Sequence, residues 1–141
     1  MDKKRFEKRV CARFEVPGTT LQFQKRKLFR KVFSREICPV LDLSRGGLSF
    51  LSRKRFRKKK HVLLKVFVFD EDPPLFLKGR VRWSSLDSEH KSQNKIQVKF
   101  LPYGHGPEMN DSTCLEKIRA LEDRFGEKPS FPNESPARPN P

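Results

Sequence analysis

The sequence predicts an all-β protein, a small six-stranded antiparallel β-barrel followed by one C-terminal α-helix and a disordered proline-rich tail. Three observations predict this fold. Apolar and polar residues alternate with a period of two along several short segments, which is typical of strands with one face in a core. About six such segments occur, a number that in antiparallel arrangement can close into a barrel without exposed edges. One stretch near the C-terminus has the spacing of an amphipathic helix instead.

Turn signals and charged runs separate the predicted strands. In chain order the strands are expected at Thr19 to Gln24, Glu36 to Leu41, Leu48 to Leu51, His61 to Phe69, Leu77 to Trp83 and Ile96 to Phe100. The first follows the turn signal Pro17-Gly18. The fourth ends at an acidic segment with two prolines, which cannot donate hydrogen bonds to a strand ladder. These breaks set the expected boundaries.

The fifth predicted strand shows the clearest alternation. Its apolar face carries Leu77, Gly79, Val81 and Trp83, and its basic face carries Lys78, Arg80 and Arg82. Strict alternation places the apolar set in the core. Trp83 is therefore expected in the core or at a barrel end rather than as a platform for stacking.

A helix is expected close to the C-terminus. Thr113-Cys114-Leu115-Glu116 has the spacing of a capping box. Leu115, Ile118, Leu121 and Phe125 then recur at helical intervals up to Gly126. This apolar stripe is expected to pack on the barrel or close one of its ends.

Chain length and composition divide the protein into three parts. Its 141 residues suffice for one domain with one core. Residues 1–13 are expected to form a flexible basic arm, residues 14–126 the barrel and helix, and residues 127–141 the tail, which holds five of the 11 prolines. The formal net charge of +15 predicts a phosphorylated or polyanionic partner.

Several classes of function lack sequence support. No apolar run is long enough to cross a membrane, and the amino terminus leads into charge, so we expect a cytoplasmic protein that is not transmembrane. Cys11, Cys38 and Cys114 are an odd and scattered set, which predicts reduced thiols. The histidines stand apart from them, so we expect no metal and no cofactor. No nucleophile is paired with a base, which argues against an enzyme.

Two short motifs point to a function. Arg9 and Arg13 form R-x-x-x-R, and residues 42–47, Asp-Leu-Ser-Arg-Gly-Gly, form D-x-S-x-x-G. In this order the pair resembles the ligand signature of the PilZ family, receptor domains for the bacterial second messenger cyclic di-GMP. The likeness covers roughly Lys8 to Leu101, because two later segments also look like barrel strands of that family. The resemblance implies a stand-alone receptor that signals through an unknown downstream protein.

The residue types suit such a ligand. An arginine fork can pair with phosphate or with guanine O6 and N7, and it can stack on a base. The resemblance makes Arg9 and Arg13 the phosphate and guanine clamps. It makes Asp42, Ser44 and Gly47 the contacts on the barrel side, with Lys8 as a third cation. Asp42 and Ser44, two residues apart, are expected to face the same object from an extended chain.

The same residues also allow interpretations that involve no ligand. Arg9 and Arg13 by themselves would also suit a solvated basic arm. Asp42 and Ser44 also fit an ordinary Asx turn, with the glycines as a simple strand connection.

Two basic segments suggest an alternative function. They run from Lys25 to Arg35 and from Arg53 to Lys60, and Phe29, Phe33 and Phe56 stand among their cations. The alternative is a basic β-barrel that binds RNA or DNA through these loops, with phenylalanine stacking on bases. Other interpretations of the run from Arg53 to Lys60 are an exposed hairpin loop, attachment to an anionic membrane and docking on an acidic protein.

Overall fold

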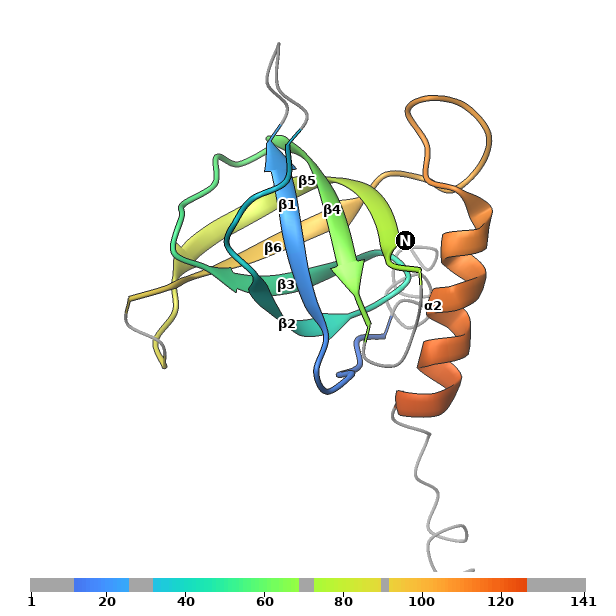
Figure 1. Cartoon of the computed structure of the whole chain (residues 1–141), viewed down its shortest axis with the longest axis horizontal. Coiled ribbons are helices and arrows are strands. Elements are labelled where there is room, and N and C mark those ends of the chain that lie inside the picture. Colours follow the sequence, from blue (N-terminus) through green and yellow to red (C-terminus); the bar gives the residue numbers. More distant parts are fainter. Residues whose placement is uncertain (1–11, 26–31, 69–72, 90–91, 127–141) are drawn as a thin grey trace, which may run out of the picture.

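The computed structural model describes residues 12–25, 32–68, 73–89 and 92–126 of the chain. Six strands precede one helix in these segments (Figure 1). The strands are β1 (Thr20–Lys25), β2 (Cys38–Leu43), β3 (Gly47–Ser52), β4 (His61–Phe67), β5 (Leu75–Leu86) and β6 (Asn94–Phe100), and the helix is α2 (Ser112–Phe125). The predicted arm up to Cys11 and the predicted tail lie outside the described residues.

The strands form one closed barrel. Around the ring their order is β1-β2-β3-β6-β5-β4, and every neighbouring pair is antiparallel. Closure comes from β1 and β4, which pair in register from Thr20 opposite Phe67 to Lys25 opposite Val62. The predicted all-β barrel with one C-terminal helix is therefore confirmed.

Some predicted boundaries are wrong by a few residues. The second strand begins at Cys38 and continues to Leu43, so Asp42 lies within a strand rather than after one. The fourth ends at Phe67 rather than Phe69, and the fifth begins at Leu75 and continues to Leu86. Strand ends are set by pairing with neighbouring strands, which local alternation does not report.

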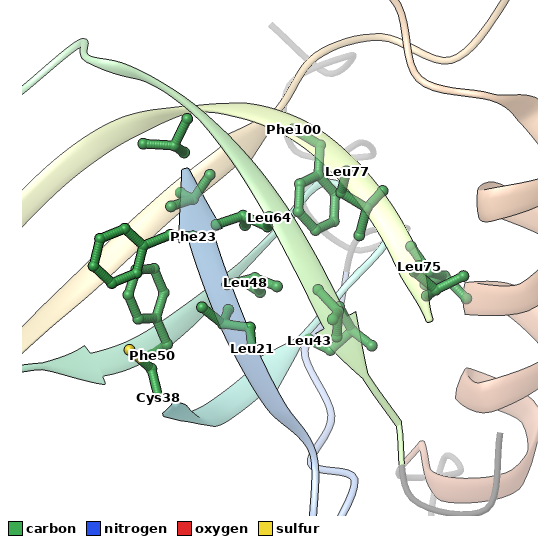
Figure 2. Close-up of a cluster of buried hydrophobic side chains, with 14 of the residues drawn as sticks. Leu21, Phe23, Cys38, Leu43, Leu48, Phe50, Leu64, Leu75, Leu77 and Phe100 are labelled. Atoms are coloured by element: carbon green, nitrogen blue, oxygen red, sulfur yellow. The ribbon is translucent and has the colours of Figure 1, made fainter. Parts of the chain in front are cut away.

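The barrel interior is filled by leucine, valine and phenylalanine. Figure 2 shows Leu21 and Phe23 of β1, Phe50 of β3 and Leu64 of β4 gathered between the strands. All four are almost completely buried. Burial alternates residue by residue along β4 and β6, which is the arrangement that a period of two predicts, whereas every residue of β3 is buried.

Trp83 does not follow the predicted alternation. The β5–β6 register shifts between Val81 and Trp83, so one extra residue, Arg82, is inserted into β5. Val81 is buried, but Arg82 and Trp83 are both exposed, and the next residue, Ser84, is half-buried. A β-bulge of this kind changes the face on which the following side chains lie. The expectation that Trp83 shares the buried face of β5 with Leu77, Gly79 and Val81 is therefore wrong.

The segment from Arg53 to Lys60 is not a hairpin loop. It joins β3 to β4, which are separated in the ring by β6 and β5, so it crosses one end of the barrel. Phe56 at its centre is only 6% exposed and makes edge contacts with Phe23 and Phe50, at centroid distances of 4.9 and 5.7 Å. Phe56 therefore closes the barrel end and is not available to stack on a base.

Helix α2 stands beside the barrel on the side away from this crossing segment (Figure 1). Ile118 and Leu121 are buried in the core, as the sequence predicts. Cys114 is also buried, whereas Leu115 of the predicted stripe is only half-buried. The N-cap, however, is Asp111 rather than Thr113: its Oδ1 accepts from the Thr113 backbone N–H at 2.9 Å, in the usual manner of a capping carboxylate. Among the described residues no helix is both long and apolar enough to span a bilayer.

The buried thiol of Cys38 gives a test of this core. Burial, reinforced by nearby Glu36 and partly offset by a hydrogen bond with Ser52, raises the pKa of Cys38 from 9.0 to about 12. Because the thiolate is the reactive form, Cys38 of the folded protein should resist iodoacetamide near pH 8. Peptide mass spectrometry should find Cys38 modified only after unfolding in guanidinium. Fast labelling of the native protein would contradict the closed barrel.

Candidate functional site

The described half of the first motif meets the second motif. The Arg13 guanidinium contacts the Asp42 carboxylate, with Nη1 2.6 Å from Oδ1. The same oxygen accepts from the Ser49 hydroxyl at 2.9 Å. The Arg13 and Asp42 side chains keep 37% and 23% of their surface exposed. Two residues 29 positions apart are thus adjacent, charged and open to solvent.

Backbone pairing next to the ion pair positions Arg13. Phe14 exchanges two backbone hydrogen bonds with Leu43, at 2.9 and 2.8 Å. The Phe14 side chain is only 4% exposed and belongs to the core. Because Phe14 and Leu43 directly follow Arg13 and Asp42, this bridge brings the two charged side chains together. The end of the arm is therefore attached to β2.

Ser44 organises the turn between β2 and β3. Its hydroxyl accepts from the backbone N–H groups of Gly46 and Gly47, both at 3.1 Å, and donates to the Gly47 carbonyl at 3.2 Å. Ser44 is 3% exposed. The expectation that its hydroxyl faces the same object as Asp42 is not met in this structure. An internal turn of this kind is the ordinary use of such a residue.

Gly47 allows two strands to approach closely. A Cβ at this position would lie 2.2 Å from the Val98 carbonyl oxygen of β6. The close approach is therefore to the neighbouring backbone, and any side chain would force β3 and β6 apart. The glycine of the motif is needed for the barrel whatever binds outside it.

Arg45 connects the turn to α2, a link that the sequence analysis missed. Its Nε lies 2.9 Å from Glu122 Oε1, and its carbonyl oxygen accepts from the Tyr103 hydroxyl at 2.6 Å. Arg45 occupies an unspecified position of D-x-S-x-x-G, and Glu122 lies 77 residues away. No local pattern could reveal such a pair.

The remaining predicted site residues, Lys8 and Arg9, lie outside the described residues. What the structure describes is an exposed cation and carboxylate beside a hydrogen-bonded turn. Such groups can recognise a ligand that carries both phosphates and hydrogen-bond donors. Within the described segments, no three His, Cys, Asp or Glu side chains are grouped to hold a metal ion.

Comparison with protein families identifies this arrangement. The PilZ domain profile matches residues 3–109, a region that contains both motifs and all six strands. The chain belongs to the PilZ domain family. No curated protein matches the sequence.

Two solved structures share the fold. One is the inhibitor of motility MotI (DgrA) of Bacillus subtilis, with a TM-score of 0.60 and 13% identity; the match covers 81% of this chain and 49% of that one. The chain therefore spans about half the length of MotI. The other is the PilZ domain of YcgR from Escherichia coli with c-di-GMP, with a TM-score of 0.54 and 13% identity; the match covers 93% of this chain and 96% of that one.

Removal of the Ser44 hydroxyl should weaken the fold in the absence of any ligand. Ser44→Ala leaves the Gly46 and Gly47 N–H groups without their buried acceptor, which costs about 1 to 3 kcal/mol. Urea unfolding followed by circular dichroism measures this loss. Ser85→Ala, at an exposed strand position, is the matched control and should change little. Equal stability of the two variants would show that the turn does not depend on Ser44.

Proposed function

We propose that this protein is a cytoplasmic cyclic di-GMP receptor that changes its surface on binding and so regulates a partner protein. Its PilZ membership and its likeness to a PilZ domain bound to c-di-GMP support this proposal. The protein would act by binding and not by catalysis. Its downstream partner would read the altered surface.

The contact between Arg13 and Asp42 carries the proposal. It brings one residue of each motif within 2.6 Å, on a surface that solvent can reach. A ligand with phosphates and guanines would meet there a cation for the former and a carboxylate for the N1 and N2 donors of the latter. Arg13 and Asp42 would have to exchange part of their mutual contact for ligand contacts. The pair would thus hold both groups ready at the site.

The other predicted contacts have different parts in the proposal. Arg9 and Lys8 would supply further cations from the arm. Ser44 and Gly47 would act chiefly by shaping the turn, because the hydroxyl is engaged within it and Gly47 lies against β6. Backbone groups of this turn, rather than the Ser44 hydroxyl, would then face the ligand.

A change at the site has a physical route to the helix. Capture of the ligand would order the arm from Arg9 to Arg13 against the barrel. The adjacent turn contacts α2 through Arg45 and Glu122.

Hydrogen exchange should therefore slow in the arm when the ligand binds. The change that the ligand causes in the exchange rates of α2 should be smaller in Glu122→Gln than in the wild type.

Titration calorimetry tests the binding itself. Protein freed of nucleic acid should bind cyclic di-GMP and neither GTP nor cyclic GMP. Single changes Arg13→Ala or Asp42→Ala each remove a charged hydrogen-bonding group, which should weaken binding by about tenfold or more. The double change Arg9→Ala, Arg13→Ala should abolish it.

The control is Arg82→Ala, which removes one exposed arginine from β5. In the barrel ring β5 lies opposite β2, so this variant should bind cyclic di-GMP as the wild type does. Folded wild-type protein that fails to bind, or a loss of affinity in Arg82→Ala equal to that in Arg13→Ala, would refute the proposal.

A further inference from the structure

An exposed tryptophan lies among cations on the outer surface of the barrel. Trp83 is 38% exposed, and the Lys95 ammonium lies 5.9 Å from its ring centroid. The bulge that turns Trp83 outward also exposes Arg82 beside it. Bulges often re-aim a side chain toward a functional surface. The candidate site at Arg13 and Asp42 does not include Trp83.

The crossing segment adds cations next to the bulge. Its turn from Arg57 to Lys60 is fastened to β5, because Val81 exchanges backbone hydrogen bonds with Lys59 and Lys60 at 2.7 and 2.9 Å. Lys59 has a backbone φ of 71°, which residues other than glycine rarely adopt. The turn is therefore held in one backbone conformation. We call the surface made by Arg57 to Lys60, Arg80, Arg82, Trp83 and Lys95 the Trp83 face.

Carboxylates are missing from the strands and turn that build the Trp83 face. Strands β4, β5 and β6 and residues 53–60 contain no Asp or Glu. Glu36 reaches the start of the crossing segment, where it accepts from Ser52 and the Arg53 N–H. Asp87 and Glu89 follow β5 beyond its end. The positive charge of this face is therefore not neutralised within its own strands, and it attracts a polyanion.

The indole ring of Trp83 favours single-stranded nucleic acid over other polyanions. A flat aromatic surface stacks on unpaired bases, while nearby cations follow the phosphates. A duplex keeps its bases stacked on one another, so the Trp83 ring adds nothing there. More than half of Trp83 is already covered, so little of the side chain is left to insert into a lipid bilayer.

We propose that the Trp83 face binds single-stranded RNA or DNA, with a base stacked on Trp83 and phosphates paired with Arg80, Arg82, Lys95 and the turn from Arg57 to Lys60. This goes beyond the basic loops that the sequence suggested, since the aromatic contact comes from Trp83 on the sheet. Phe56, the aromatic residue within the crossing segment, is buried in the barrel end.

This face is separate from the cyclic di-GMP site. β5 lies opposite β2 in the ring, and the bulge lies toward the barrel end that Phe56 closes. The turn at Ser44 lies toward α2 instead, through the pair of Arg45 and Glu122. The two proposals therefore stand or fall independently, and a variant at either site is a control for the other.

The chain contains one tryptophan, so its fluorescence reports on this face alone. We would titrate the full chain with oligo(U) and oligo(dT) of about 15 nucleotides, following both tryptophan quenching and the anisotropy of a labelled oligonucleotide. A duplex of the same length and vesicles rich in phosphatidylglycerol are the comparison ligands. Titrations from about 50 to 200 mM salt give the number of phosphate contacts.

Single strands should quench Trp83 and bind more tightly than the duplex. Trp83→Ala should weaken this binding by roughly tenfold or more. Arg80→Gln with Arg82→Gln should make the slope of log K against log salt shallower by about 1 to 1.5. Arg13→Ala should bind oligonucleotide nearly as the wild type does. The matched control for charge, Lys117→Gln with Arg119→Gln on the exposed side of α2, should keep the quenching and the salt slope close to those of the wild type.

Other results would overturn the proposal. Binding seen by anisotropy without tryptophan quenching would place the nucleic acid elsewhere on the chain. Equal losses in the Arg80, Arg82 variant and in the Lys117, Arg119 variant would reduce the effect to net charge. Quenching by vesicles but not by oligonucleotides would make the Trp83 face a membrane contact.

Discussion

The pairing of β1 with β4 is the constraint on which the rest of this structure depends. It closes the six strands into a ring, and a ring has no free strand edge but two open ends. Each end must then be covered to keep the core dry. The crossing segment covers one end with Phe56, and α2 packs beside the other with Ile118 and its neighbours. Both candidate sites are built on these covers, because the D-x-S-x-x-G turn contacts α2 and the basic turn is fastened to β5.

Burial of Phe14 holds the end of the arm in place more strongly than the ion pair of Arg13 and Asp42 does. A partly exposed ion pair such as Arg13 and Asp42 contributes about 0 to 1 kcal/mol, since water and salt screen it. Burying a phenylalanine side chain contributes roughly 1.5 to 3 kcal/mol. Phe14 is buried and bonded to Leu43, so it fixes where the arm meets β2. The weak pair beside it then costs little to rearrange, which suits a site that must open to receive a ligand.

Much of this fold could be predicted from sequence because alternation is a local signal that closely follows burial on a strand. The six strands could be predicted in that way, and the helix could be predicted from the helical spacing of its apolar residues. Trp83 was misplaced because a bulge adds one residue, and no local pattern marks Arg82 as that residue. The crossing of residues 53–60 and the pair of Arg45 with Glu122 depend on strand order and on contacts distant in sequence. Ser44 and Gly47 could be identified as motif residues from the sequence. Their contacts within the turn and with β6 could not, because these contacts form only when the barrel is assembled.

Two sites on one small barrel need not influence each other. Coupling requires an element with two arrangements that both ligands bias. Charge alone is a weak link, because exposed charges are largely screened beyond about 8 Å at physiological salt. The mechanical link is β6, which pairs with β3 on one side and with the bulged β5 on the other. Gly47 packs against the Val98 carbonyl of β6, and Val98 is also the residue opposite Val81, where the bulge begins. A shift of the motif turn would therefore reach the Trp83 face only by displacing β6, and a β6 that stays in place would keep the two sites independent.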